Sequence, residues 1–320
     1  MKNKLICVLG GTGFVGQHLV HRLTKEGYSV RVLARRPERH RSLIVNPDVR
    51  LVAADVSSMH DLHSHLAGAG TVINLVGILN ESGKKDPGFQ QLHVELPQQI
   101  ATAAVECGVT RLLHMSALNA NAGETLSQYL RTKGEGENRV HAAAREGLQI
   151  TSFRPSVIFG PGDSFFNRFA TLLKITPLVF PLACPQSRFA PVYIGDVVNA
   201  FCRALVDDST GGQRLELCGP DSYTLQELVE YTRDTLGTKQ RIIGLNNRLS
   251  RLQARLLGIM PGKPFSMDNY YSLQSDSLCR NNALPALGIT PTPVAAVVPG
   301  YLINQHQRGR YNTYRRETRR

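Results

Sequence analysis

The sequence begins with a short apolar run that leads directly into a cluster of glycines. Leu5–Leu9 has the composition of a buried strand, and the residues from Phe14 onward fit the start of a helix. Glycines at the spacing found here let the backbone turn sharply and approach a pyrophosphate, which the first amides of the helix then hold. In this strand-to-helix context the turn predicts a dinucleotide-binding chain. The turn reads Gly10, Gly11, Thr12, Gly13, Phe14, Val15 and Gly16.

The composition limits the class of protein. Of the 320 residues 42% are hydrophobic and 19% are charged, as in ordinary soluble globular proteins of one elaborated domain or two. No apolar stretch approaches the ~18 residues of a membrane span, and the N-terminal apolar run lacks a small-residue cleavage site, so we expect neither a membrane helix nor a signal peptide. The six cysteines and ten histidines are scattered without metal-like spacing. This pattern favours reduced thiols, no metal and a cytoplasmic protein, with the inner face of the cytoplasmic membrane as a second location.

The net charge of +12 is unusual for an enzyme of small molecules. Part of it lies in the tail Gln307–Arg320, which suits an anionic partner: a phospholipid surface, an acidic protein or nucleic acid. Nucleic acid is the least favoured partner, because no RNA-binding motif or aromatic platform accompanies the arginines. The alternative is a solvated, disordered extension. The tail arginines are Arg308, Arg310, Arg315, Arg316, Arg319 and Arg320.

Apolar strands alternate with helical patterns along the first half of the chain. This alternation predicts the α/β class, with right-handed crossovers and a doubly wound, Rossmann-like parallel sheet whose ligands lie beyond the carboxyl ends of its strands. We expect a nucleotide-binding domain over residues 1–223 with a substrate-lobe insertion at about 160–188, a smaller helical lobe over 224–305, and a disordered basic tail over 306–320. The expected strands after the first are Ser29–Ala34, Arg50–Ala53, Thr71–Val76, Arg111–Ser116 and Ile150–Phe153, and the expected helices include Phe89–Glu106 and Ser127–Arg145.

The end of the second expected strand bears on the choice of dinucleotide. A site selective for NAD places Asp or Glu there to hold the ribose 2′-hydroxyl. This chain has Ala34 at that position, followed by Arg35 and Arg36. Arginine pairs with a 2′-phosphate through charge-assisted hydrogen bonds, so the sequence favours NADP(H) over NAD(H). The alternative is an exposed basic turn without a ligand.

Tyr129 and Lys133 are four residues apart in an expected helix, so both side chains project from one face. A free phenol titrates near ~10, and a lysine beside it favours the phenolate. Such a tyrosine passes a proton to or from a carbonyl or hydroxyl while hydride moves to or from a nicotinamide. The alternative is a surface tyrosine stacked on a lysine stem. Downstream of a nucleotide-binding turn, the pair predicts an oxidoreductase.

Taken together, these motifs resemble the extended short-chain dehydrogenase/reductase superfamily. More narrowly, the chain up to about Tyr301 resembles an atypical subgroup that includes the nucleotide-binding accessory subunit of mitochondrial complex I and a protein of coenzyme Q biosynthesis. The first resemblance rests on the glycine turn, Asp55-Val56, Asn74–Gly77, Tyr129 with Lys133, and Arg154–Gly162. The second rests on Val72–Gly77, Leu113–Ala122, Tyr129–Gly136, Pro155–Asp163 and Pro191–Asn199.

The resemblance implies a set of cofactor-binding residues. They are Gly10, Thr12, Gly13, Phe14, Val15 and Gly16 at the pyrophosphate, Arg35 and Arg36 at the 2′-phosphate, Asp55 and Val56 at the adenine, Asn74, Leu75, Val76 and Gly77 on the ribose side, Ser116 and Lys133, and Pro155, Val157 and Ile158 behind the nicotinamide. Asp55 is equally well explained as a turn residue.

The chain departs from the family at the substrate-orienting hydroxyl. Extended reductases carry consecutive Ser or Thr residues after the fifth strand, whereas this chain offers Ser116 alone, followed by Ala117. Ser116 is therefore either the orienting group or a side chain that satisfies a buried backbone group. Asn119 is a possible substitute donor, or an ordinary turn residue. This departure places turnover in question.

The substrate side lacks a second strong phosphate-binding group. Arg188 occupies the position at which extended reductases often meet the phosphate of a sugar nucleotide. The residues around it favour a hydrophobic substrate, such as a quinone or an isoprenoid-linked ring, although most of them are expected in the core. These residues are Phe165, Phe166, Phe169, Leu172, Leu173, Phe180 and Leu182.

A basic amphipathic helix is expected near residue 250. It either lies in a membrane interface or, as the favoured interpretation, packs on the sheet domain. One face carries Leu245, Leu249, Leu252 and Leu256, and another carries Arg248, Arg251 and Arg255.

Two functions compete. The first is an NADP-dependent oxidoreductase of a lipophilic carbonyl or quinone-type compound, in which Tyr129 is the acid/base, Lys133 its activator, and Ser116 or Asn119 the orienting group. The second is a non-catalytic subunit that holds NADPH within a respiratory or quinone-synthesis assembly. Sugar-nucleotide epimerisation is a weaker enzymatic alternative.

Overall fold

The computed structural model describes residues 5–81, 87–123, 125–144, 147–260 and 264–303, so the arginine-rich tail lies outside the described residues. Its centre is a seven-stranded, all-parallel sheet in the order β11-β6-β5-β4-β1-β2-β3. This confirms the doubly wound class, with one strand, β11, that the sequence patterns did not predict. The strands are β1 Leu5–Leu9, β2 Ser29–Ala34, β3 Val49–Ala53, β4 Thr71–Asn74, β5 Arg111–Met115, β6 Gln149–Pro155 and β11 Arg214–Leu217.

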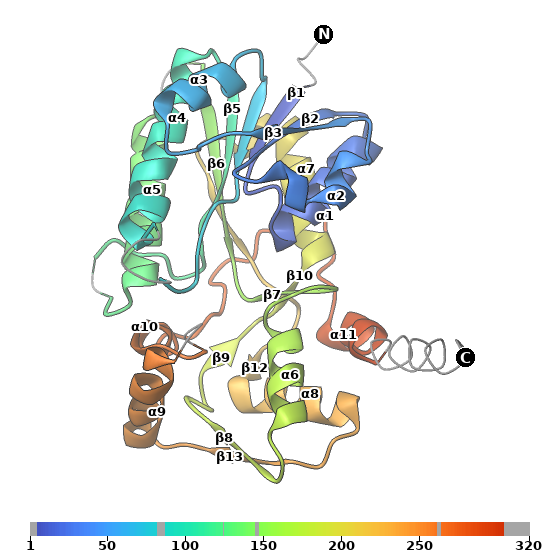
Figure 1. The fold of residues 1–320 in the computed structure, drawn as a ribbon, viewed down its shortest axis with the longest axis vertical. Coiled ribbons are helices and arrows are strands. Elements are labelled where there is room, and N and C mark those ends of the chain that lie inside the picture. Colours follow the sequence, from blue (N-terminus) through green and yellow to red (C-terminus); the bar gives the residue numbers. More distant parts are fainter. Residues whose placement is uncertain (1–4, 82–86, 124, 145–146, 261–263, 304–320) are drawn as a thin grey trace.

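Helices cover both faces of this sheet (Figure 1). The central strand β1 shows why: Ile6 and Val8 pack against the α1 and α7 side, whereas Cys7 and Leu9 pack against the α3 and α4 side. Since alternate residues of a strand point to opposite faces, an uninterrupted apolar strand needs a helix layer on each face. The helices of this domain are α1 Phe14–Lys25, η1 Pro37–Arg39, α2 Arg41–Ile44, α3 Met59–Leu66, α4 Leu96–Glu106, α5 Gln128–Ala142, α7 Ile194–Val206 and η3 Asp208–Thr210.

Two expected helices carry details that the patterns did not reveal. The one expected over Phe89–Glu106 contains a π-helical segment, η2 Gln90–Glu95, before α4. The one expected over Ser127–Arg145 is α5, in which the Ser127 side chain caps the helix by accepting from the Leu130 amide at 3.3 Å. π-Helical turns are rare and often occur at functional sites.

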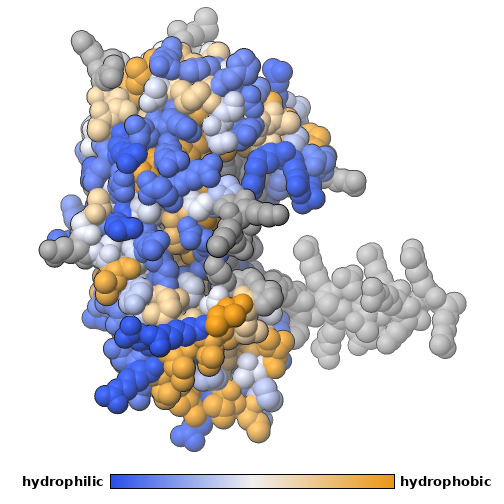
Figure 2. All heavy atoms as spheres, turned by 60° about the vertical axis from the view of Figure 1, so that its left-hand side comes forward, coloured by the Kyte–Doolittle hydropathy of each residue, from blue (hydrophilic) through white to orange (hydrophobic). Residues whose placement is uncertain are grey.

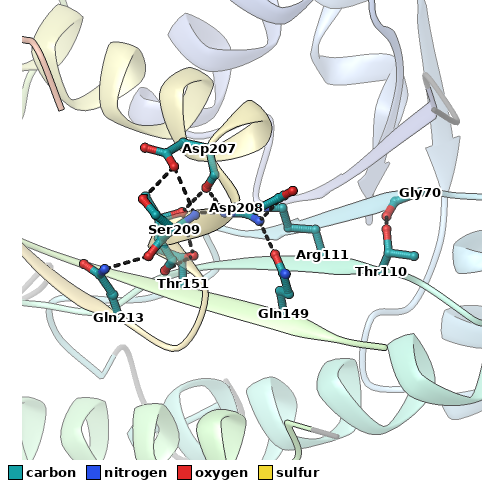
Figure 3. A network of polar contacts seen from close by, with 10 residues as sticks. Gly70, Thr110, Arg111, Gln149, Thr151, Asp207, Asp208, Ser209 and Gln213 are labelled. Carbon is teal, nitrogen blue, oxygen red and sulfur yellow. Dashed lines mark hydrogen bonds and ion pairs between the residues drawn. The ribbon is translucent and has the colours of Figure 1, made fainter. Parts of the chain in front are cut away.

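A buried arginine joins the amino ends of β5 and β6 to the end of α7 (Figure 3). The Arg111 guanidinium donates to Gln149 Oε1 at 2.6 Å and to the Asp207 carbonyl at 2.8 Å, and it also contacts Thr210 and Asp208. These contacts lie where the strands begin. In a parallel sheet the ligand edge is the opposite one, so this network stabilises the fold rather than a site.

A second lobe lies below the sheet in Figure 1. Its apolar core includes Phe166, Leu173, Phe180 and Leu182, which confirms the expectation that most apolar residues of this segment are core. Its elements are β7 Ile158–Phe159, α6 Phe166–Ile175, β8 Val179–Leu182, β9 Arg188–Phe189, β10 Val192–Tyr193, β12 Tyr223–Thr224, α8 Leu225–Leu236, β13 Arg241–Gly244, α9 Asn247–Ile259, α10 Met267–Ser272 and α11 Val294–Leu302.

The segment after α10 returns to the sheet domain, where Leu284 and Leu287 join the core beside α7. A disulfide between Cys218 and Cys279 links this segment to the end of β11. The expectation of six reduced thiols is therefore wrong for this pair. The two cysteines are 61 positions apart, and only the fold brings their Cα atoms to 6.0 Å.

The expected amphipathic helix is α9, and it does not pack its leucines on the sheet domain. Leu249, Leu252 and Leu256 are exposed, whereas the buried residues of the helix are Ser250 and Ala254. The favoured interpretation was therefore wrong, because the small residues and not the leucines face the protein. Among the described residues, no helix combines the length and the apolar character needed to cross a membrane.

Candidate active site

The glycine turn joins β1 to α1 at the carboxyl edge of the sheet. Gly10 has φ +77°, and a Cβ there would come within 2.8 Å of the Leu75 carbonyl carbon. A Cβ at Gly16 would come within 2.4 Å of the Gly10 oxygen, so both positions require glycine for close backbone packing. Gly13 is the N-cap of α1, no side chain caps this helix, and its first turn contains no acid. The first amides and the dipole of α1 are thus available to an anion, which fits the pyrophosphate of a dinucleotide.

The ends of β2 and β3 carry the residues expected at the adenosine. Ala34 is buried, and Arg35 and Arg36 follow it with exposed side chains. Asp55 accepts hydrogen bonds from the amide and hydroxyl of Ser57, at 3.0 and 2.7 Å. These bonds, with Arg35 contributing, lower the pKa of Asp55 below its ordinary value. Asp55 therefore shapes a turn and adds negative charge beside the arginine pair.

The segment Asn74–Gly77 follows β4. The buried Asn74 side chain accepts from the Val76 amide at 3.0 Å and contacts His114 Nδ1 at 3.3 Å, which fixes the path of the chain. A Cβ at Gly77 would lie 2.9 Å from Lys133 Nζ. The loop after β4 and helix α5 therefore meet at the lysine, and a side chain at Gly77 would displace it.

Lys133 is buried at the carboxyl end of β5. Its ammonium donates to the Met115 carbonyl at 3.1 Å, beside Ser116. Burial lowers the pKa of Lys133 from 10.5 to about 8, although Glu137 one turn later opposes the shift. The buried Glu137 is itself paired with Arg154, whose Nη2 lies 2.7 Å from its carboxylate. The lysine is thus cationic at neutral pH but close to its titration.

Tyr129 is on the same face of α5 as Lys133. Its partly buried ring makes edge contacts with Phe89 and His93, with centroid distances of 6.1 and 5.5 Å. Its hydroxyl makes no hydrogen bond to any described residue. Burial raises the pKa of Tyr129 to about 12, and the carboxylate of Asp268 adds to the rise. Lys133 is not among the groups that shift this pKa, so the expectation that it favours the phenolate is not met and the phenol is protonated at neutral pH.

Asp268 reaches this helix from the second lobe. Its carboxylate accepts from the backbone amide of Gln128 at 2.5 Å and from the Ser127 hydroxyl at 3.2 Å, and it also contacts the amide of Tyr129. An acid at this point complements the dipole of α5. The cap therefore ties the position of α5 to α10, a connection that no local sequence signal could reveal.

His93 is a second site residue that sequence reasoning missed. Its Nε2 accepts from the Ile78 amide at 3.1 Å, so the proton is on Nδ1, which donates to the Thr132 hydroxyl at 3.1 Å. Burial, and then the charge of Lys133, lower the pKa of His93 to about 2. A neutral histidine from the π-helical segment therefore holds the loop after β4 against α5. One histidine within a helical pattern gave no signal of this role.

Ser116 follows β5 directly. Its side chain is buried, and its hydroxyl oxygen has no hydrogen-bond partner among the described residues. The alternative in which this hydroxyl satisfies a buried backbone group therefore has no support. Ala117, also buried, adds no polar group. An unpaired buried hydroxyl beside Lys133 is the arrangement expected of a group that binds a ligand.

The remaining expected residues lie around this centre. The carbonyl of Pro155 accepts a hydrogen bond from the Leu118 amide at 3.0 Å. This bond places the segment of Pro155, Val157 and Ile158 against the chain that follows β5. Asn119 has φ +63°, and its side-chain amide donates to the Asp276 carbonyl at 2.7 Å, so this donor is already engaged. Arg188 is exposed and donates to the Ser222 hydroxyl at 2.9 Å.

The chain is similar to known proteins over most of its length. Residues 6–218 match the model of the NAD dependent epimerase/dehydratase family. The chain is 30% identical over 292 residues to subunit 9 of the NADH dehydrogenase [ubiquinone] 1 alpha subcomplex of Arabidopsis thaliana, which covers 87% of this chain and 71% of that protein. It is 31% identical over 247 residues to a ceramide reductase of Caulobacter vibrioides, covering 75% and 73%. Its fold matches a dTDP-glucose 4,6-dehydratase of Streptomyces venezuelae with NAD bound, at TM-score 0.72 and 19% identity, covering 95% and 98%.

Proposed function

Since the chain belongs to the NAD dependent epimerase/dehydratase family of extended short-chain dehydrogenases/reductases, whose cofactor is NAD(P), we propose that it is an NADP-dependent oxidoreductase of lipophilic carbonyl or quinone-type compounds. The observation that carries the proposal is the buried, unpaired hydroxyl of Ser116 next to the carbonyl that the Lys133 ammonium binds. Tyr129, with a protonated phenol, shares one face of α5 with Lys133 and would complete the group.

The cofactor would lie along the carboxyl ends of β1 to β4. The glycine turn and the start of α1 hold the pyrophosphate, and Arg35 and Arg36 pair with a 2′-phosphate. Two features support this preference. Position 34 holds alanine and not an acid, and both arginines are exposed just beyond it. NADPH supplies the hydride when it is bound.

The side chains supply the rest of the reduction. The hydroxyl of Ser116 donates a hydrogen bond to the substrate carbonyl and holds it beside Tyr129. As the carbonyl carbon gains hydride, the Tyr129 hydroxyl gives its proton to the carbonyl oxygen. Lys133, one turn later on the same face of α5, would stabilise the tyrosinate that remains, until solvent returns the proton. A phenol whose pKa is about 12 begins the reaction protonated, as this direction requires.

The lipophilic substrate class has two supports. Arg188, the residue expected to meet a phosphate on the substrate side, is engaged with Ser222. A related protein of Caulobacter vibrioides is a ceramide reductase. Both favour a lipophilic carbonyl over a nucleotide sugar.

A non-catalytic role is the second candidate. In it, the chain holds NADPH as a structural cofactor within a respiratory or quinone-synthesis complex. The relationship to complex I subunits favours this role, and so does Ala117, which leaves a single hydroxyl after β5. The two candidates differ in turnover and agree on cofactor binding.

The test is NADPH oxidation by the purified protein with short-chain quinones and long-chain ketones. We expect Tyr129→Phe and Ser116→Ala to reduce kcat by roughly 100-fold or more while NADPH affinity stays within about 2-fold. Tyr231→Phe, a partly buried tyrosine of the second lobe, is the matched control and should keep full activity. Tight NADPH binding with no turnover on any of these substrates would favour the structural role.

A further inference from the structure

Helix α9 exposes an apolar face to solvent. Its leucines and isoleucine follow each other at intervals of three and four residues, so they form one stripe along the helix. The opposite face is the buried one, formed by Ser250 and Ala254. The stripe consists of Leu249, Leu252, Leu256 and Ile259, with exposed fractions of 47%, 51%, 61% and 85%.

Arginines accompany this stripe along one flank. Arg248, Arg251 and Arg255 are exposed, and their guanidinium groups make no ion pair or hydrogen bond to any described residue. Helix α9 contains no aspartate or glutamate. The helix therefore presents an apolar strip beside unneutralised positive charge.

A second apolar surface adjoins α9. The parallel strands β8 and β13 bury Phe180 and Ile242 on their inner side, and leave Val179 and Ile243 exposed on the outer one. Gln253 of α9 donates to a carbonyl of β8 at 3.1 Å, which places the helix against this strand. Figure 2 shows the result as hydrophobic surface gathered on the lower lobe beside strongly hydrophilic side chains.

We propose that this surface docks on an anionic phospholipid bilayer, with α9 lying in the plane of the interface. The stripe inserts among the first acyl carbons, while the arginines reach the phosphates of the headgroups. A charged flank beside an apolar stripe is the pattern of helices that lie in a membrane interface. The docking surface is separate from the nucleotide site and does not depend on the proposed reaction.

Charge complementarity selects the bilayer over a second copy of this chain. An antiparallel two-fold pairing of α9 with itself brings the same surface together and places the two arginine flanks side by side, and α9 offers no acid to pair with them. The stripe also lacks the aromatic residues that dominate protein interfaces. Positive charge of this kind contributes to binding at the anionic leaflet of a membrane.

The first experiment is co-sedimentation of the full chain with vesicles of phosphatidylcholine alone or with about one third phosphatidylglycerol. We expect binding to the anionic vesicles, and a loss of at least tenfold in affinity for the double variants Leu252→Glu/Leu256→Glu and Arg251→Gln/Arg255→Gln. The matched controls are Val45→Glu, at another strongly exposed apolar residue, and Arg50→Gln with Lys25→Gln, and they should bind within about 2-fold of the parent. Circular dichroism and NADPH affinity check that each variant is folded.

The second experiment uses the absence of tryptophan from the chain. In Leu252→Trp the fluorescence should shift to the blue on addition of anionic vesicles, whereas in Val45→Trp it should not. Deletion of 307–320 separates α9 from the basic tail, and the shift should persist. No vesicle binding by the parent, binding that depends on the tail alone, or self-association that disappears with Leu252→Glu/Leu256→Glu would overturn the proposal.

Discussion

Replacing Lys133 by methionine should make the protein more stable at neutral pH. The ammonium is buried, and its pKa falls from 10.5 to about 8 because burial disfavours the charged form. At roughly 1.4 kcal/mol per pH unit, that gap corresponds to about 3 kcal/mol of folding free energy lost at pH 7. Methionine removes this cost but leaves the Met115 carbonyl without its donor, which costs about 1–2 kcal/mol. We therefore expect a net gain of about 1–2 kcal/mol.

The pH dependence gives the sharper test. Below pH 8 the lysine is protonated in both the folded and the unfolded state, so its full cost applies. Between about 8 and 10.5 the unfolded state holds the proton more tightly than the folded state, and the stability of the parent rises with pH. Near pH 10.5 the parent no longer carries the cost of burying the ammonium, so the variant differs from it only by the lost hydrogen bond to the Met115 carbonyl. The difference between variant and parent should therefore change sign across this window.

The assay is urea unfolding followed by circular dichroism at pH 7, 8, 9, 10 and 10.5, with the disulfide intact. The matched control is Lys174→Met, an exposed lysine of α6, which should stay within about 0.5 kcal/mol of the parent at every pH. A variant that is destabilised at pH 7, or a difference that does not vary between pH 8 and 10.5, would refute the argument from burial.

Three further predictions follow from single contacts. Gly16→Val should weaken NADPH binding by roughly 100-fold in a fluorescence titration, since its Cβ would displace the backbone of the glycine turn; unchanged affinity would place the cofactor elsewhere. Glu137→Ala should lower the urea-unfolding free energy by about 3 kcal/mol, because it leaves Arg154 unpaired and largely buried; a loss below about 1 kcal/mol would contradict this. Asp268→Asn should speed hydrogen exchange in the first turn of α5 and cost about 0.5–1 kcal/mol, as the charge that complements the helix dipole is lost; unaltered exchange there would contradict the cap.

The parts of the fold that sequence predicted are those encoded by local patterns. The strands of the sheet are apolar runs bounded by turn residues, and the glycine turn adjoins β1, so a short window contains the whole signal. The pair Tyr129 and Lys133 is likewise set by helical spacing within one element. The alternation of strands and helices then fixed the class of the sheet, because few connections between parallel strands are possible.

The parts that sequence could not predict depend on contacts between distant segments. Cys218 and Cys279 are 61 positions apart, and Asp268 caps a helix 140 positions before it. Whether the leucines of α9 face the protein or the solvent depends on which face of the helix the rest of the lobe covers. The spacing of the leucines in the sequence is the same in both cases. The pKa of Tyr129 followed burial, which no count of neighbouring charges in the sequence measures.

These features bear on the choice between a catalyst and a nucleotide holder. A chain that only holds NADPH also needs the glycine turn and the other residues expected to bind the cofactor, which include Lys133, so this lysine is compatible with either role. The hydroxyls of Ser116 and Tyr129 differ, because neither has a protein partner among the described residues. That of Ser116 is also buried, and a buried unpaired hydroxyl costs stability. If the chain had no substrate, Ser116→Ala would be neutral or stabilising without any loss of function. Activity loss in Ser116→Ala, together with equal or greater stability, would show that the unpaired hydroxyl serves a reaction.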